Sequence, residues 1–116
     1  ITNVGRVGRT IKARIRCQPA PNMITSNPIT NKIYAANRNS ANVTVIDGTN
    51  NSTQTVATGT TPNAIEANPV TNKIYVSNNG SSTVTVIDGS DNSTQTVSVG
   101  ANSIDVAINP ATNKIY

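Results

Sequence analysis

The chain has 116 residues, enough for one small domain, and 35% of them are hydrophobic, with no Trp and no Phe. The absence of His excludes Ser-His-Asp and Cys-His catalysis and the commonest zinc and iron ligands, and the single Cys17 excludes an intrachain disulfide. The formal net charge is +4, but the first sixteen residues contain five of the nine bases, namely Arg6, Arg9, Lys12, Arg14 and Arg16. The other hundred residues carry four bases and five acids, a net charge of −1, so the basic balance does not indicate a nucleic-acid surface.

The basic stretch from Arg6 to Arg16 is the first feature along the chain. Between Thr10 and Arg16 apolar and cationic residues alternate, which is typical of an amphipathic strand at the edge of a sheet. The alternative is a surface that binds nucleic acid or an anionic polymer. The stretch lacks the interleaved aromatic residues that favour single-strand binding, so we favour the edge strand.

A repeat of 41 residues governs the rest of the chain. Thr-Asn-Lys-Ile-Tyr recurs and ends at Tyr34, Tyr75 and Tyr116, and residues 35–75 match residues 76–116 at 22 of 41 positions without a gap. We therefore divide the chain into an incomplete, degenerate first repeat at 1–34, a second at 35–75 and a third at 76–116. Together they form one partial assembly of repeats.

Each complete repeat reads as four short strands. In the second repeat we expect strands at 42–47, 52–58, 63–68 and 72–77, and in the third at 83–88, 93–99, 103–109 and 113–116. Val43-Thr44-Val45-Ile46 has the period of two that strands require, and both faces carry apolar or β-branched residues. A sheet of that kind needs neighbours on both sides. We therefore predict an all-β protein of four-stranded antiparallel blades in a β-propeller, with essentially no helix.

The same Asp-Gly turn occurs in both complete repeats. Asp47-Gly48 and Asp88-Gly89 each follow a strand, where the carboxylate can accept bonds from backbone amides and Gly can supply a positive φ. We therefore interpret these four residues as structural.

The strings Asn-Pro-Val-Thr-Asn-Lys-Ile-Tyr-Val-Ser-Asn at 68–78 and Thr-Val-Thr-Val-Ile-Asp-Gly at 83–89 resemble the YVTN β-propeller repeat. Tyr75-Val76-Ser77-Asn78 is a close variant of the tetrapeptide that names this family, and the resemblance covers residues 20–116. It implies that the segments Ile24–Pro28, Ile65–Pro69 and Val106–Pro110 are the innermost strands of their blades. It also implies a protein of the cell surface, because family members often occur in surface-layer and other cell-surface proteins of archaea and bacteria.

Glu66 and Asp105 lie in or near these inner strands, so they could face a central channel and line a ligand site. A solvated channel wall is the simpler interpretation. The segment from Asp88 to Asn92 resembles a calcium loop only faintly, because it lacks the spaced acids and the distal Glu. We expect no catalytic residue, no metal and no cofactor.

Five Asn-X-Ser/Thr sequons occur in this Asn- and Thr-rich chain. Asn51 and Asn92 occupy the same repeat position in a predicted hairpin, so they are the candidate acceptors if the protein is secreted by a glycosylating organism.

These features predict a non-catalytic structural or interaction module of a cell-surface or extracellular assembly in a prokaryote. The first alternative is a propeller that binds a small ligand or glycan in its channel. A propeller enzyme, such as a lyase or a dehydrogenase subunit, ranks last because the chain has no His and few acids.

Three repeats are too few to close a ring, since propellers need roughly four to eight blades. We therefore expect partners, which are either other copies of the chain in a closed dimer or filament, or further blades of a longer chain. Cell-surface proteins or glycans are further candidates. The sequence predicts no membrane span, because no stretch approaches the roughly 20 apolar residues that a helix needs to cross the bilayer.

Overall fold

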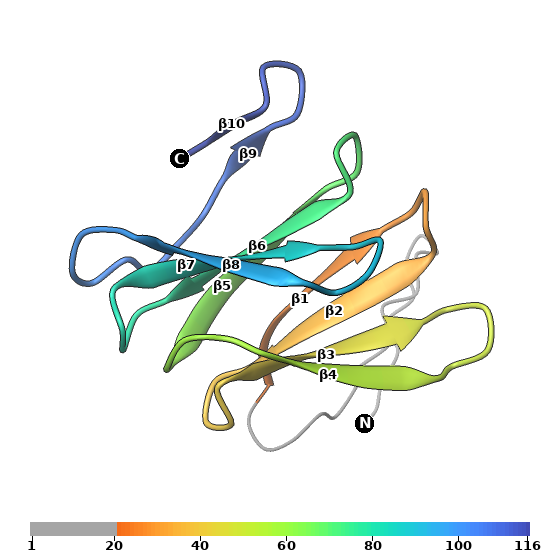
Figure 1. Ribbon diagram of the computed structural model, residues 1–116, viewed down its shortest axis with the longest axis horizontal. Coiled ribbons are helices and arrows are strands. Elements are labelled where there is room, and N and C mark those ends of the chain that lie inside the picture. The colour runs from red at the N-terminus through yellow and green to blue at the C-terminus, as the bar shows by residue number, and fades with distance from the viewer. Residues whose placement is uncertain (1–20) are drawn as a thin grey trace, which may run out of the picture.

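A computed structural model describes residues 21–116, and every regular element in this range is a β-strand (Figure 1). The ten strands are β1 (Pro21–Asn27), β2 (Lys32–Asn37), β3 (Asn42–Asp47), β4 (Thr53–Ala57), β5 (Pro62–Asn68), β6 (Lys73–Asn78), β7 (Thr83–Asp88), β8 (Thr94–Ser98), β9 (Ile108–Asn109) and β10 (Lys114–Ile115). They form three antiparallel sheets: blade 1 from β1–β4, blade 2 from β5–β8, and a two-stranded blade 3 from β9 and β10. The predicted all-β architecture of four-stranded antiparallel blades is confirmed.

The expected features of the N-terminal segment lie outside the described residues. They are the basic stretch from Arg6 to Arg16, Cys17 and most of the degenerate first repeat.

Strand bounds follow the alternation in the sequence closely. The strands at 42–47 and 83–88 lie where the pattern predicts them, and in each blade consecutive strands pair in order, so every blade is a simple meander. The strand expected at 103–109 is wrong in length, because the strand in the structure is Ile108–Asn109. Backbone bonds between Ala107 and Tyr116 continue the ladder by one pair, and residues 103–106 have no strand opposite them in the described chain.

The last residue of the Tyr-Val-Ser-Asn string explains part of this regularity. Asn78 is fully buried at the end of β6, and its Nδ2 donates to the hydroxyls of Thr83 and Thr85 on β7 at 3.1 and 2.9 Å. Asn37 does the same in blade 1 with Asn42 and Thr44. Each bond joins the second strand of a blade to the third, so this Asn stabilises the hairpin that it ends.

The Asp-Gly turns differ from the expectation in one respect. The left-handed residues of these turns are Asn51 and Asn92, both with a φ of 63°, so the expected positive φ at Gly48 and Gly89 is wrong. The glycines are needed for close approach instead. A Cβ at Gly48 would lie 2.6 Å from Oδ1 of Asn31, because the Gly48 N–H donates to the Asn31 carbonyl at 2.8 Å.

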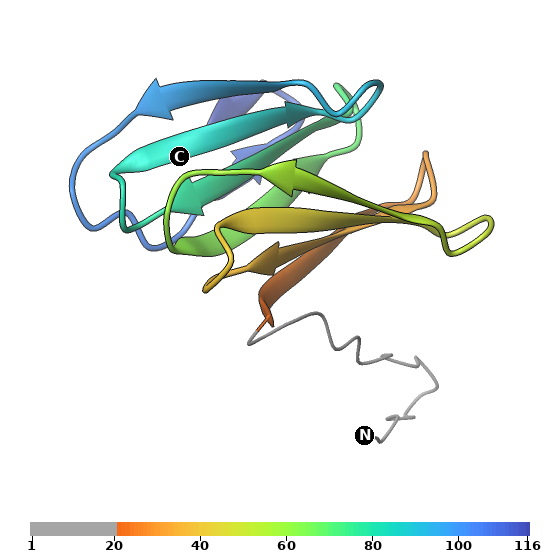
Figure 2. The same ribbon diagram turned by 60° about the horizontal axis from the view of Figure 1, so that its bottom comes forward.

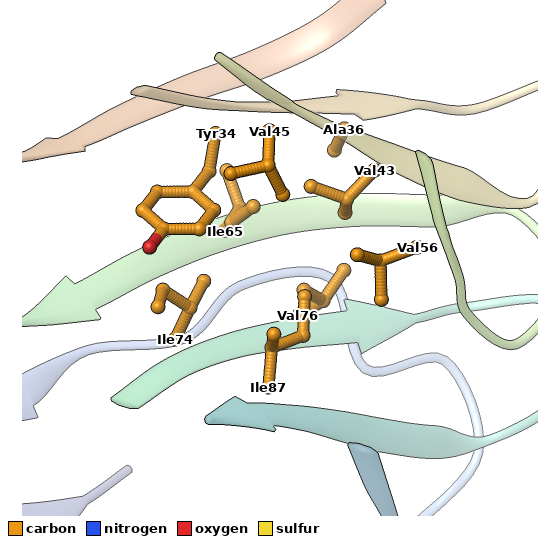
Figure 3. Packing of buried hydrophobic residues seen from close by; sticks show 9 residues of the cluster. All are labelled: Tyr34, Ala36, Val43, Val45, Val56, Ile65, Ile74, Val76 and Ile87. Carbon is orange, nitrogen blue, oxygen red and sulfur yellow. The ribbon is translucent and has the colours of Figure 1, made fainter. Parts of the chain in front are cut away.

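The hydrophobic core lies between blades 1 and 2 (Figure 3). Blade 1 contributes Tyr34, Ala36, Val43, Val45 and Val56, and blade 2 contributes Ile65, Ile74, Val76 and Ile87. Register explains this segregation: Tyr34 is opposite Val45, and Ala36 is opposite Val43, so these side chains share one face of blade 1. We call this the forward face of blade 1, and the face of blade 2 that covers it the rear face of blade 2.

The first strands of the blades lie side by side, since β5 contacts both β1 and β9. Figures 1 and 2 show blade 2 stacked against one face of blade 1, with the outer strands β4 and β8 away from this inner row. The two four-stranded sheets span residues 21–57 and 62–98. These bounds are offset from the sequence repeats 35–75 and 76–116, so one sequence repeat does not correspond to one blade.

Candidate functional site

The turn acids stabilise their own hairpins. Oδ1 of Asp47 accepts a bond from the Thr49 N–H at 2.8 Å, and Oδ1 of Asp88 accepts from both the N–H and the hydroxyl of Ser90 at 2.9 and 2.6 Å. Lys73 Nζ lies 3.1 Å from Oδ2 of Asp88. The two Ser90 bonds, followed by Lys73, lower the pKa of Asp88 to about 2, and the Thr49 bonds lower the pKa of Asp47.

The two acids expected in a channel have different partners. Glu66 is half-buried on β5, where its Oε1 lies 3.5 Å from the Thr25 hydroxyl of blade 1, at the long limit of a hydrogen bond. Asp105 is exposed before β9, and its Oδ1 accepts from the adjacent Val106 N–H at 2.8 Å. Glu66 therefore lies at the inner edge between blades 1 and 2, whereas Asp105 caps its own backbone.

The sequence did not predict a pair of hydrogen bonds that join neighbouring blades at the Asn-Pro dipeptides. Asn27 is 1% exposed; its Oδ1 accepts from the Ile29 N–H at 3.0 Å and its Nδ2 donates to Asn72 of blade 2 at 3.0 Å. Asn68 repeats the arrangement and donates to Asn113 at 3.2 Å. We call these contacts the Asn clips. The sequence contains a signal for these contacts, because Asn-Pro recurs every 41 residues at 27–28, 68–69 and 109–110, and the partner Asn of each clip belongs to the recurring Thr-Asn-Lys-Ile-Tyr string.

An open hollow lies at the outer rim, between blade 1 and the β7–β8 turn of blade 2. It has a volume of about 490 Å³. Its lining residues are Gln54, Thr55, Val56, Ala57, Asp91, Asn92 and Thr94. We call it the rim cavity. The sequence did not predict this hollow, because only the stacking of two blades brings β4 and the β7–β8 turn together.

The two candidate glycosylation sites have different surroundings. Asn51 is exposed in the β3–β4 turn of blade 1. Asn92 is partly buried, and its Nδ2, the atom that would carry a glycan, donates to Gln54 Oε1 of blade 1. The neighbouring blade therefore restricts access to Asn92.

Within residues 21–116, no three His, Cys, Asp or Glu side chains are grouped so that they could hold a metal ion. The oxygens of Asp88 are used by Ser90 and Lys73, and Oδ1 of Asp91 accepts from the Ser93 N–H at 2.9 Å. The same described range has no helix that is long and apolar enough to cross a membrane.

No protein-family model matches the sequence, and no curated protein matches it. Among solved structures, the fold is similar to a functionally unknown protein from Desulfotomaculum acetoxidans DSM 771, with a TM-score of 0.78 at 13% identity over 94% of this chain. It is also similar to apo AztD from Citrobacter koseri, with a TM-score of 0.56 at 20% identity over 71% of this chain. This chain spans 38% of the first protein and 24% of the second. The similarity therefore concerns the fold alone.

Proposed function

We propose that the chain is a non-catalytic structural or interaction module of the β-propeller type, acting in a cell-surface or extracellular assembly. The observation that carries this proposal is an apolar face that the described chain leaves partly open. Val56, on the forward face of blade 1, is 7% exposed, whereas Val97, at the same repeat position on blade 2, is 48% exposed. Exposed apolar surface of this kind is typical of contact surfaces between proteins or between repeats.

The partner that this face fits best is another blade. Blade 1 is covered by a rear face built from Ile65, Ile74, Val76 and Ile87, and blade 3 supplies only β9 and β10 to cover blade 2. The missing surface would come from other copies of the chain, as a closed dimer or a filament, or from further blades of a longer chain. The resemblance to YVTN repeats supports placing such an assembly outside the cell.

Light scattering coupled to size exclusion tests this proposal at micromolar concentration. We expect the chain to elute as a larger species, because a free monomer would leave the forward face of blade 2 in water. Val97→Asp should weaken this association. Val70→Asp is the matched control, because Val70 is 71% exposed at the tip of the β5–β6 hairpin, off the forward face. A stable species near the chain mass of 12.1 kDa would refute the proposal.

The second candidate is a module that binds a small ligand or glycan in a central channel. Glu66 favours it, because this carboxylate is half-buried at the inner edge between the blades and its contact with Thr25 is long. A glycan array probed with the chain and with Glu66→Gln tests this function. Binding that depends on Glu66 would support it, and an array without signal would exclude glycans as the ligand.

A further inference from the structure

The outer edge of β4 is free for pairing in the described chain. β4 is the last strand of blade 1 and pairs only with β3. The Asp47 N–H donates to the Ser52 carbonyl, and the Thr58 N–H donates to the Ala41 carbonyl. In an antiparallel pair, residues whose backbone groups bond to the neighbouring strand alternate with residues whose groups point away, so these two bonds set which residues of β4 face β3. It follows that the backbone N–H and C=O groups of Thr53, Thr55 and Ala57 point away from β3, towards the free edge.

This edge lacks the features that normally prevent pairing with another strand. Natural edges are usually blunted by Lys, Pro, a bulge or a short strand length. β4 reads Thr-Gln-Thr-Val-Ala, with neither a charge nor a proline, and its register with β3 is regular over five pairs. Four of its five residues are exposed. The edge therefore retains a full capacity for main-chain hydrogen bonding.

The rim cavity lies directly beside this edge. Gln54 and Val56 point to the forward face, and Asp91, Asn92 and Thr94 of blade 2 form the opposite wall. Oδ1 of Asn92 is buried without a hydrogen-bond partner within the described residues. Asp91 is the charged residue of the lining, so the cavity favours a cation.

We propose that the β4 edge binds an extended peptide by strand addition, with one Lys or Arg side chain entering the rim cavity towards Asp91. Strand addition supplies affinity through the main chain, and a side-chain pocket beside the edge supplies specificity. Alternate side chains of the added strand face the cavity because strands have a period of two. This inference rests on the proposed function, since it names a partner of an interaction module.

Blade 2 provides an internal comparison. β8 has nearly the same sequence as β4, Thr-Gln-Thr-Val-Ser, and the same outer position. Opposite β8, however, blade 3 contributes only β9 and β10 in the described chain, so no turn equivalent to Asp91 and Asn92 forms a second wall. Within the described chain, the hollow with two walls therefore lies beside β4 and not beside β8.

Fluorescence anisotropy with the complete chain and a labelled heptapeptide, Thr-Val-Thr-Lys-Thr-Val-Thr, tests the proposal. Thr55→Pro removes an outward N–H at an edge position where Pro is tolerated, so we expect binding to weaken by about tenfold or more. Thr96→Pro makes the same change at the equivalent position of β8 and should leave binding unchanged. Circular dichroism of both variants checks that the fold is kept.

A second pair of measurements tests whether the rim cavity selects a cationic side chain of the peptide. Asp91→Asn should weaken binding of the lysine peptide by about threefold or more and leave binding of a norleucine peptide unchanged. Equal binding by Thr55→Pro and the parent, or no binding of the peptide at all, overturns strand addition. An equal effect of Asp91→Asn on both peptides overturns the cation site. If Thr55→Pro lowers the solution mass instead, the edge pairs with a second copy, and the peptide proposal is wrong while the proposed function stands.

Discussion

The forward faces of blades 1 and 2 carry closely similar residues and differ in burial. Tyr34 and Val56 of blade 1 are 0% and 7% exposed, while their repeat equivalents on blade 2, Tyr75 and Val97, are partly buried and exposed. Because the two repeats have closely similar sequences, the strands and their pairing are nearly the same in both blades. The burial of a side chain, and hence its contribution to stability, is therefore decided by the neighbouring blade rather than by its own repeat.

The largest expected contrast is at the repeat tyrosines. Tyr34→Ala should lower the free energy of unfolding by about 3–5 kcal/mol, because it opens a cavity between two blades. Tyr75→Ala should cost distinctly less, since Tyr75 is only partly covered. Urea unfolding of both variants measures the difference. Equal costs would show that blade 2 is covered in solution as fully as blade 1.

The Asn clips give the next largest effect. Asn27→Ala or Asn68→Ala should cost about 1–3 kcal/mol, because each removes a buried side chain that accepts a partly buried N–H of its own turn and donates to the Asn of the next blade. Asn109→Ala is the matched control: among the described residues, Asn109 is exposed and accepts bonds within its own turn, from Ala111 and Thr112. Thermal melts in which all three variants overlay would contradict an inter-blade role.

Tyr34→Phe should change stability in the opposite direction. The Tyr34 hydroxyl is buried and has no hydrogen-bond partner within residues 21–116, and burial raises its pKa. Removing an unsatisfied buried hydroxyl should stabilise the protein by up to about 1–2 kcal/mol. Tyr75→Phe, in the partly covered blade, should leave the melting temperature nearly unchanged. A destabilised Tyr34→Phe would indicate a partner for this hydroxyl.

Asp47→Ala and Asp88→Ala should both lower the melting temperature slightly, because each removes a carboxylate that holds its turn. The decrease should be larger for Asp88, which also accepts from the Ser90 hydroxyl and from Lys73. These groups are at the surface, so the pair with Lys73 contributes little by itself. Melts that overlay the parent would show that the structural interpretation of both acids is wrong.

The pH dependence sharpens this last comparison. The pKa of Asp88 is lowered to about 2 from its ordinary value of 3.8, so the folded protein binds this proton less readily than the unfolded chain. Its contribution to stability is therefore complete above about pH 4 and is lost as the pH falls towards about 2. Acid melts should show a loss of stability in this window that is reduced in Asp88→Ala. The same loss in parent and variant would assign the acid sensitivity to other groups.

The sequence by itself determined most of the strand positions and the places of the Asp-Gly turns. The alternation of Val with Thr and the recurring Asp-Gly set them locally, because strand faces and turn bonds involve residues close together in the chain. The residues of the Asn clips could have been selected from the sequence, since they recur with the repeat. The local sequence does not predict, however, that Asn27 bonds to Asn72 of the next blade.

Only the tertiary structure decided the rest. It showed that Gly48 is needed for its close approach to Asn31 and not for a positive φ, since that depends on two turns meeting. It also revealed the hollow at the outer rim, where β4 meets Asp91 and Asn92 of the next blade. In each case the deciding contact joins residues of different strands or blades, and a repeat pattern carries no information on how the next repeat stacks on it.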